Sequence, residues 1–192
     1  NTIYQDIVRY ADEQSAKVIE KKIIANTYQR DYEASKGWAD RSTIVVKNAA
    51  GDIVERQEIT YGAYDIYGNS ISQEITRYGY GASGEEILLD FKIAENAYIS
   101  DIGKLKGLAD RAAIKTYNNR GGICIERQDV VYGAYDASGN VTKQEVTRYA
   151  DEGAATILDY KEITNTYDDS SGTWRAKGWV GTAAILTYTR KD

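Results

Sequence analysis

Adjacent carboxylates are the residues of this chain best suited to chemistry. They occur at four places, Asp12 and Glu13, Glu85 and Glu86, Asp151 and Glu152, and Asp168 and Asp169. Two carboxylates held about 5–10 Å apart across a sugar can hydrolyse a glycosidic bond. Asp12 and Asp151, however, are equivalent positions of an internal repeat, whereas a catalytic pair should be unique. We therefore expect solvated turns here, no catalytic residue and no enzyme activity, and keep a carboxylate-based hydrolase as a third hypothesis.

Metal and cofactor sites have few ligands to draw on. The chain has no histidine and one cysteine, Cys124, which we interpret as a small apolar residue. Two Asp-x-x-Gly-Asn loops, at 65–69 and 136–140, offer oxygen ligands on a glycine turn, but fewer than the six to eight that calcium requires. The Gly-rich stretch at 78–84 is a weak phosphate cradle, and no Walker or dinucleotide motif is present. We predict no metal and no cofactor.

Aromatic side chains are the other candidates for a ligand site. The chain has 17 tyrosines and three tryptophans. Trp38 and Trp179 are equivalent positions of the repeat, and Leu108 stands at the intermediate one, so this position favours an apolar packing residue. Trp174 lies in a segment that is longer than its counterparts. It is therefore our candidate for stacking against a sugar.

Charge and hydropathy exclude some partners. A net charge of -5 argues against a nucleic-acid or anionic-lipid partner. No apolar run reaches the roughly 18–20 residues of a membrane span, so we expect no membrane insertion. Because the chain begins with Asn1, we expect a processed product or an excised piece.

Three short motifs recur in one order, which is the signature of a repeat protein. Q-[DE]-[IV]-[VT]-R-Y occurs at 5–10, 73–78 and 144–149; N-[TA]-Y at 26–28, 96–98 and 165–167; and K-G-[WL]-[AV] at 36–39, 106–109 and 177–180. Equivalent positions lie about 70 residues apart. The sequence therefore predicts three homologous blocks.

The repeat sets the boundaries of these blocks. They span 1–51, 69–121 and 140–192, and two connectors, 52–68 and 122–139, carry the pattern E-R-Q-[ED]-[IV]-x-Y-G-A-Y-D. With three blocks and two connectors, either the chain was cut at equivalent points or a connector is missing where head and tail would meet. An open array and a closed pseudo-threefold arrangement both remain alternatives.

Averaging the copies predicts the secondary structure. Residues 10–25 alone have helix-like apolar spacings, but their counterparts at 87–96 and 157–165 alternate with the period of two typical of a strand. We therefore expect strands in all three copies, and a mostly antiparallel, all-β tandem array. Turns are predicted where glycine accompanies asparagine or aspartate, at 48–51, 65–69, 118–122, 136–140 and 168–172.

An arginine precedes the last tyrosine of the first motif in every copy. These pairs are Arg9–Tyr10, Arg77–Tyr78 and Arg148–Tyr149. We predict that they make cross-strand or stacking contacts. Charges that alternate on one strand face recur at Glu20 and Lys22, Asp90 and Lys92, and Asp159 and Lys161, which is typical of a solvated face that discourages edge aggregation.

The turns of the connectors resemble a known repeat. Tyr64-Asp65-Ile66-Tyr67-Gly68-Asn69 and the stretch from Tyr135 to Thr142, YDASGNVT, are similar to the tyrosine–aspartate (YD) repeats of Rhs-like secreted proteins. The resemblance covers about a dozen residues at each place. It implies an extracellular or surface β-repeat scaffold without catalytic residues.

We predict that the chain is a structural protein, a subunit or fragment of a cell-surface or extracellular fibre, filament or sheath. Copies would self-associate through β-strands, for which the candidate residues are Ile3, Tyr4, Ile7, Ile185, Leu186 and Tyr188. A carbohydrate-binding or adhesive module, with glycans as partners of exposed Trp and Tyr, is the first alternative. A shell or scaffold fragment of an Rhs-like protein is the second.

Overall fold

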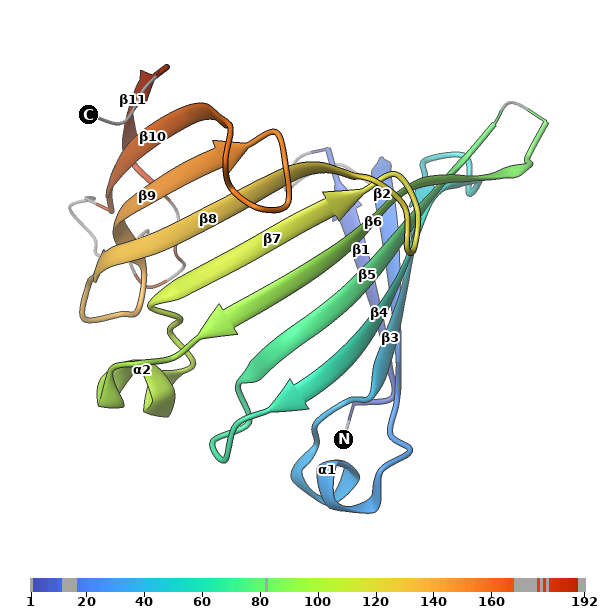
Figure 1. The fold of residues 1–192 in the computed structure, drawn as a ribbon. Helices are drawn as coiled ribbons and strands as arrows, with labels where there is room; N and C mark the ends of the chain where they lie inside the picture. The colour runs from blue at the N-terminus through green and yellow to red at the C-terminus, as the bar shows by residue number, and fades with distance from the viewer. Residues whose placement is uncertain are drawn as a thin grey trace. The chain divides into compact units, whose positions relative to one another are not determined.

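The computed structural model describes residues 2–11, 17–81, 83–167, 176, 178 and 180–189. These residues form an antiparallel sheet of eleven strands in which the strand order follows the chain (Figure 1). The all-β prediction is confirmed. The strands are β1 (Tyr4–Tyr10), β2 (Val18–Thr27), β3 (Arg41–Asn48), β4 (Ile53–Tyr64), β5 (Ser70–Tyr80), β6 (Glu86–Ala97), β7 (Arg111–Tyr117), β8 (Cys124–Tyr135), β9 (Val141–Tyr149), β10 (Ile157–Thr166) and β11 (Thr182–Tyr188).

The chain divides into two compact units. Unit 1 comprises Asn1–Ile93 and Tyr117–Ile123, and so holds β1 to β5 and most of β6. Unit 2 comprises Ala94–Thr116 and Cys124–Asp192, and so holds β8 to β11 and nearly all of β7. Each unit is a meander in which every strand pairs with the next.

The segment with conflicting signals is a strand. β2 pairs with β3, and β-branched residues lie opposite one another at Ile23↔Val45 and Ile24↔Ile44. Branched side chains fit a pleated surface better than a helix. The strand prediction taken from the two other copies is confirmed, and the local helical spacing was misleading.

Two short helices were not predicted. α1 (Asp31–Lys36) and α2 (Asp101–Lys106) lie outside the sheet, before β3 and β7 (Figure 1). Each ends on a left-handed glycine, Gly37 with φ 79° and Gly107 with φ 68°, and each has acidic residues in its first turn and lysine in its last. The Lys-Gly of the third motif, at 36–37 and at 106–107, is therefore a helix C-terminus. Neither helix of the described residues is long and apolar enough to cross a membrane.

The predicted turns are hairpin loops at four places, 48–51, 65–69, 118–122 and 136–140. The fifth, 168–172, lies outside the described residues. Glycine also explains the Tyr-Gly-Ala-Tyr of each connector. Gly62 and Gly133 stand where the registers of β4–β5 and β8–β9 shift by one residue, which is the place of a β-bulge.

Few side chains are buried deeply. In the described part of the chain none is fully buried, and most strand residues are half-exposed. Cross-strand pairs therefore contribute much of the specificity of the sheet. The buried residues are Asp40, Ser42, Phe91, Gly103, Ala112, Tyr117, Val130, Thr147, Tyr160 and Tyr167.

Candidate functional site

The Asp-x-x-Gly-Asn loops use their carboxylates internally. Asp65 accepts hydrogen bonds from the amides of Tyr67 and Asn69, both at 2.9 Å, and from the Asn69 side chain at 2.8 Å. Asp136 accepts equivalent bonds within its own loop. These bonds close the turn between a connector strand and the strand that follows. Among the described residues, no group of three or more His, Cys, Asp or Glu side chains could hold a metal ion.

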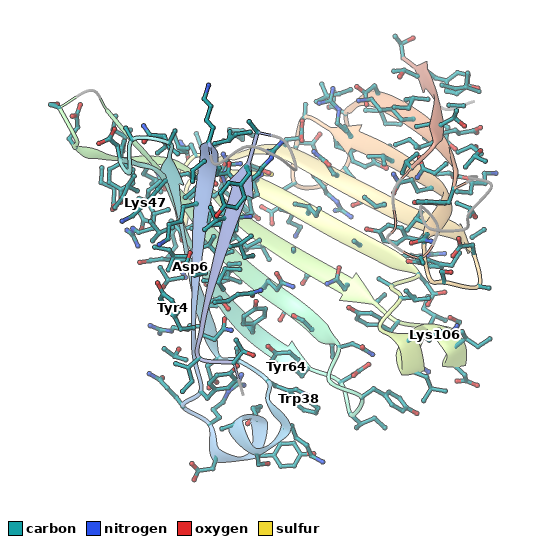
Figure 2. The ribbon with its side chains drawn as sticks, turned by 180° about the vertical axis from the view of Figure 1, so that it is seen from behind. Tyr4, Asp6, Trp38, Lys47, Tyr64 and Lys106 are labelled. Carbon is teal, nitrogen blue, oxygen red and sulfur yellow. The ribbon has the colours of Figure 1, made fainter. Side chains whose placement is uncertain are left out.

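The glycine of the same loop receives an apolar side chain from the third motif. Trp38 lies against Gly68, which has φ 91°, and stacks on Tyr64 with ring centroids 5.3 Å apart (Figure 2). In unit 2 the corresponding contact is Leu108 against Gly139. The packing interpretation of Trp38 is confirmed.

An aspartate after the third motif ties each helix to the sheet. Asp110 accepts hydrogen bonds from the amides of Ile99 at 2.6 Å and Ser100 at 3.0 Å, and Asp40 bonds the two amides that precede α1. These bonds hold the pKa of Asp110 below its usual range, with the Ser100 amide contributing most. Both aspartates also hydrogen-bond through their backbone to the strands on either side.

In the second motif, the asparagine and tyrosine side chains both donate a hydrogen bond to the same backbone carbonyl. Asn26 Nδ2 and the Tyr28 hydroxyl both donate to the Thr2 carbonyl at 2.9 Å. The copy at residues 165–167 donates in the same way to Val141, at 3.1 and 2.9 Å. The motif therefore fixes the start of the strand that carries the first motif.

The arginine and tyrosine of the first motif take different partners. Tyr78 lies under the Arg56 guanidinium at 4.2 Å, and Tyr149 lies 6.0 Å from that of Arg127. Both of these arginines belong to connector strands and lie directly opposite the tyrosines. The predicted arginine–tyrosine stacking therefore exists, but with an arginine of the neighbouring strand.

Two of the three first-motif arginines, Arg77 and Arg148, form ion pairs on the other face. Arg148 lies 2.5 Å from Asp159 on β10 and 3.0 Å from Glu126 on β8. Arg77 makes longer contacts of 3.7 Å with the acids on both of its neighbouring strands. Each arginine thus joins three strands, one of which is a connector.

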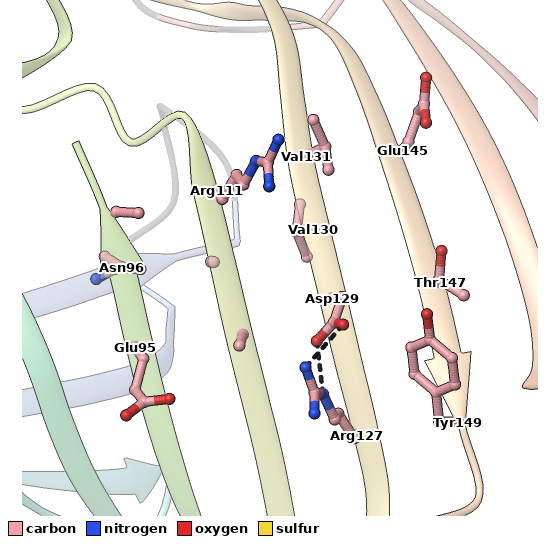
Figure 3. Close-up of a pocket in the computed structure, with 13 residues that line it drawn as sticks. Glu95, Asn96, Arg111, Arg127, Asp129, Val130, Val131, Glu145, Thr147 and Tyr149 are labelled. Atoms are coloured by element: carbon pink, nitrogen blue, oxygen red, sulfur yellow. Dashed lines mark hydrogen bonds and ion pairs between the residues drawn. The ribbon is translucent and has the colours of Figure 1, made fainter. Parts of the chain in front are cut away.

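Unit 2 contains an open groove on the sheet face that carries Tyr149. Its volume is about 460 Å³, and its lining includes the small side chains Ala97 and Ala113. Figure 3 shows the larger lining side chains, among them Arg127, Asp129 and Tyr149. Arg127 forms a bidentate pair with Asp129 at 2.8 and 2.9 Å, which raises the pKa of Arg127. The remaining lining residues are Glu95, Asn96, Arg111, Ala112, Val130, Val131, Glu145, Thr147 and Tyr149.

The chemistry open to this groove is narrow. Its carboxylates can accept hydrogen bonds and Tyr149 offers an aromatic ring, a combination suited to a polar ligand with hydroxyl groups. Its described lining contains no cysteine, and the chain has no histidine. General acid or base catalysis there would fall to the carboxylates or to the Tyr149 hydroxyl.

In unit 1 the connector arginine Arg56, the counterpart of Arg127, belongs to a charged network. Arg56 donates to both carboxylate oxygens of Glu86 at 2.7 and 2.9 Å, and the Tyr80 hydroxyl donates to Glu86 at 2.7 Å. The Arg56 hydrogen bonds, with that of Tyr80, lower the pKa of Glu86 to about 2. This network accounts for Glu86, one member of the carboxylate pair at 85–86.

The other carboxylate pairs are accounted for in part. Asp151 accepts hydrogen bonds from the amides of Ala155 and Thr156 within a turn, and Glu152 lies 3.1 Å from Lys115. The pairs at 12–13 and 168–169 lie outside the described residues, as does Trp174.

The predicted assembly residues lie on β1 and β11, the first and last strands of the sheet, or just before β1. Every described residue of both strands is exposed. The six predicted side chains are 42% to 68% exposed: Ile3, Tyr4, Ile7, Ile185, Leu186 and Tyr188. The structure thus places them at strands with a neighbour on one side only.

The backbone of β1 has an edge that pairs with none of the described residues. The Asn26 amide donates to the Ile3 carbonyl at 2.8 Å, so residue 3 and every second residue after it bond to β2. Because bonding alternates along an antiparallel strand, the N–H groups of Tyr4, Asp6 and Val8 point away from β2. This edge can accept another strand.

Sequence reasoning missed two sets of residues that organise these sites. Arg56 and Arg127, and Asp40 and Asp110, were not selected. The signal was present in the recurrence of Glu-Arg-Gln in both connectors and of aspartate after Lys-Gly-[Trp/Leu]-Ala.

Comparison with protein-family models finds no match, and comparison with curated proteins finds none. The similarity of the connectors to YD repeats therefore stays a prediction.

Proposed function

We propose that this chain is a non-enzymatic structural segment of an extracellular or cell-surface fibre, filament or sheath. In this proposal it consists of three homologous blocks with a period of about 70 residues, joined by two connectors. Side-chain contacts that recur at equivalent sequence positions support the block organisation. Asp40 matches Asp110, Asp65 matches Asp136, and Trp38–Gly68 matches Leu108–Gly139.

The observation that carries the proposal is the exposure of the two outer strands. β1 contains the same motif as β5 and β9, yet all of its residues are exposed, whereas nearly all of those of β5 and β9 are half-buried or buried. Exposed, uncovered edge strands with large apolar side chains are surfaces for strand addition.

The shallow burial of the sheet supports growth strand by strand. When no deep core exists, each strand is stabilised mainly by its two neighbours, as in other repeat proteins. An added strand would therefore bury about as much of β1 as β4 buries of β5.

Sedimentation velocity over a wide concentration range, with electron microscopy of the same samples, tests this function. We expect the wild type to form larger species as concentration rises, and Ile7→Lys on β1 and Ile185→Lys on β11 to suppress them. Ile66→Lys is the matched control, since Ile66 is 83% exposed but lies in a turn. A wild type that stays monomeric and forms no fibres at high concentration would refute the proposal.

Glycan binding is the second candidate, favoured by the groove of unit 2. Tyr149 and the carboxylates of Asp129 and Glu145 offer the ring and acceptors that a sugar requires. A glycan array with wild type and Tyr149→Ala tests it. Signal that is lost in the variant supports the groove, and equal signal in both contradicts it.

A further inference from the structure

We infer that the free edge of β1 binds one further strand of connector type, antiparallel to β1. The occupant is an extended segment with the pattern E-R-Q-[DE]-[IV]-x-Y, presented by another polypeptide chain. The inference rests on the proposed function, because it assumes that this edge is used for strand addition. It adds the identity of the partner strand and its register.

The first-motif strands define the expected neighbour. β5 carries the motif at 73–78 and pairs with the connector strand β4, and β9 carries it at 144–149 and pairs with β8. β1 carries the motif at 5–10 and, among the described strands, pairs with β2 alone. The side of β1 that faces no strand is the side on which β5 and β9 hold a connector.

The two connector pairings share one register. The connector arginine lies opposite the motif tyrosine, the connector glutamine opposite the motif arginine, and the connector tyrosine opposite the motif glutamine. Ile59 and Val130 lie opposite the apolar residues Ile75 and Val146. Transferred to β1, this register places an arginine opposite Tyr10, a glutamine opposite Arg9 and an apolar residue opposite Ile7.

Within the described part of the chain, two side chains of β1 lack contacts that their counterparts make. Arg148 contacts an acid on each side, Asp159 on β10 and Glu126 on the connector strand. Arg9 has Glu20 opposite on β2 and no connector strand on its other side. Tyr10 is 51% exposed, whereas its counterparts lie under connector arginines. The glutamate and arginine of a connector supply both missing contacts.

The backbone agrees with this assignment. The outward N–H groups of Tyr4, Asp6 and Val8 are those that an antiparallel strand would accept, because the hydrogen bonds of β1 to β2 occupy the alternate residues. Charge adds specificity, because an acid on the incoming strand is attracted to Arg9. A strand without the Glu-Arg-Gln sequence could accept the backbone hydrogen bonds of β1 but would make no contact of this kind with Arg9 or Tyr10.

A synthetic peptide of residues 52–68 is the probe. We expect it to bind the full chain and to slow hydrogen exchange of the Tyr4, Asp6 and Val8 amides at least tenfold, measured by NMR. A scrambled peptide should bind at least tenfold more weakly. Val8→Pro removes one outward donor and leaves the β1–β2 bonds in place, so it should weaken binding without changing the fold.

A double-mutant cycle tests the register. Arg9→Ala in the protein and Glu55→Ala in the peptide should each raise the Kd. With both substitutions, the increase in Kd should be about threefold smaller than the product of the two single increases, as for a partly exposed ion pair. Independent effects, equal binding of the scrambled peptide, or protection at other strands would overturn the inference.

Sedimentation without peptide separates the two claims. If the protein self-associates but does not bind the peptide, this inference is refuted and the proposed self-association is not. A protein that remains monomeric but binds the peptide in the stated register supports the inference and refutes assembly between copies.

Discussion

At the residue scale, the loop glycine of the connector is constrained by backbone and neighbour together. Gly68 has φ 91°, a conformation in which a Cβ is unfavourable, and a Cβ there would overlap the Trp38 indole. The residues that recur in this chain thus serve turns and strand junctions, each through a contact that can be removed singly.

Substitution of Gly68 by alanine should destabilise the protein by about 2–3 kcal/mol, since strain and overlap add. Gly51→Ala is the matched control, because Gly51 has φ 94° and open space around the added methyl group. It should cost about 1 kcal/mol. Urea unfolding of both variants measures the difference, and equal losses would contradict the packing of Trp38 on Gly68.

Glu86 should make stability depend on acid pH. Its pKa is lowered to about 2 from an ordinary value of 4.5, so the folded protein binds this proton less readily than the unfolded chain. Its contribution is present above about pH 4.5 and is lost as the pH falls toward 2. The melting temperatures of wild type and Glu86→Gln should therefore differ at pH 6 and converge near pH 2. A gap that stays constant with pH would contradict this.

At the scale of elements, the helices depend on aspartates that lie after them in sequence. Asp110 accepts hydrogen bonds from the two backbone amides that precede α2. Asp101, in the first turn of α2, has a side chain that is 98% exposed. Asp110→Asn should cost about 1–2 kcal/mol, because a charged acceptor of two amides is lost, while the control Asp101→Asn should change little. Amide exchange of α2 should accelerate in the first variant only. Equal stability and equal amide exchange in the two variants would contradict the claim that Asp110 stabilises α2.

The strands were predictable and the helices were not, for physical reasons. Equivalent copies resolved the ambiguous segment of β2, because alternation was clear in β6 and β10. The helices are six residues long and too short to show a 3.6-residue period.

The cross-strand partners of individual side chains could not be predicted from the sequence either. The arginine that meets Tyr78 depends on the register between β4 and β5, which pairing alone defines. The exposed edge residues were predicted because they belong to the first and last motif-bearing segments, and the unit 2 groove was missed because its lining comes from four strands.

At the scale of the whole molecule, the sheet is a meander with one outer strand in each unit. Of the strands that the structure describes, β1 and β11 have one neighbour each and every strand between them has two. We propose that copies of the chain join at these two edges. Charges alone do not protect β1, because Asp6 is already paired with Lys21 at 2.7 Å.

Hydrogen exchange of β1 as a function of protein concentration tests this claim most directly. The amides of Tyr4, Asp6 and Val8 should exchange rapidly in dilute protein and become protected as larger species form, while the amide of Tyr67 in the exposed turn is unchanged. Larger species in which those three amides still exchange as rapidly as in the monomer would contradict assembly through the β1 edge.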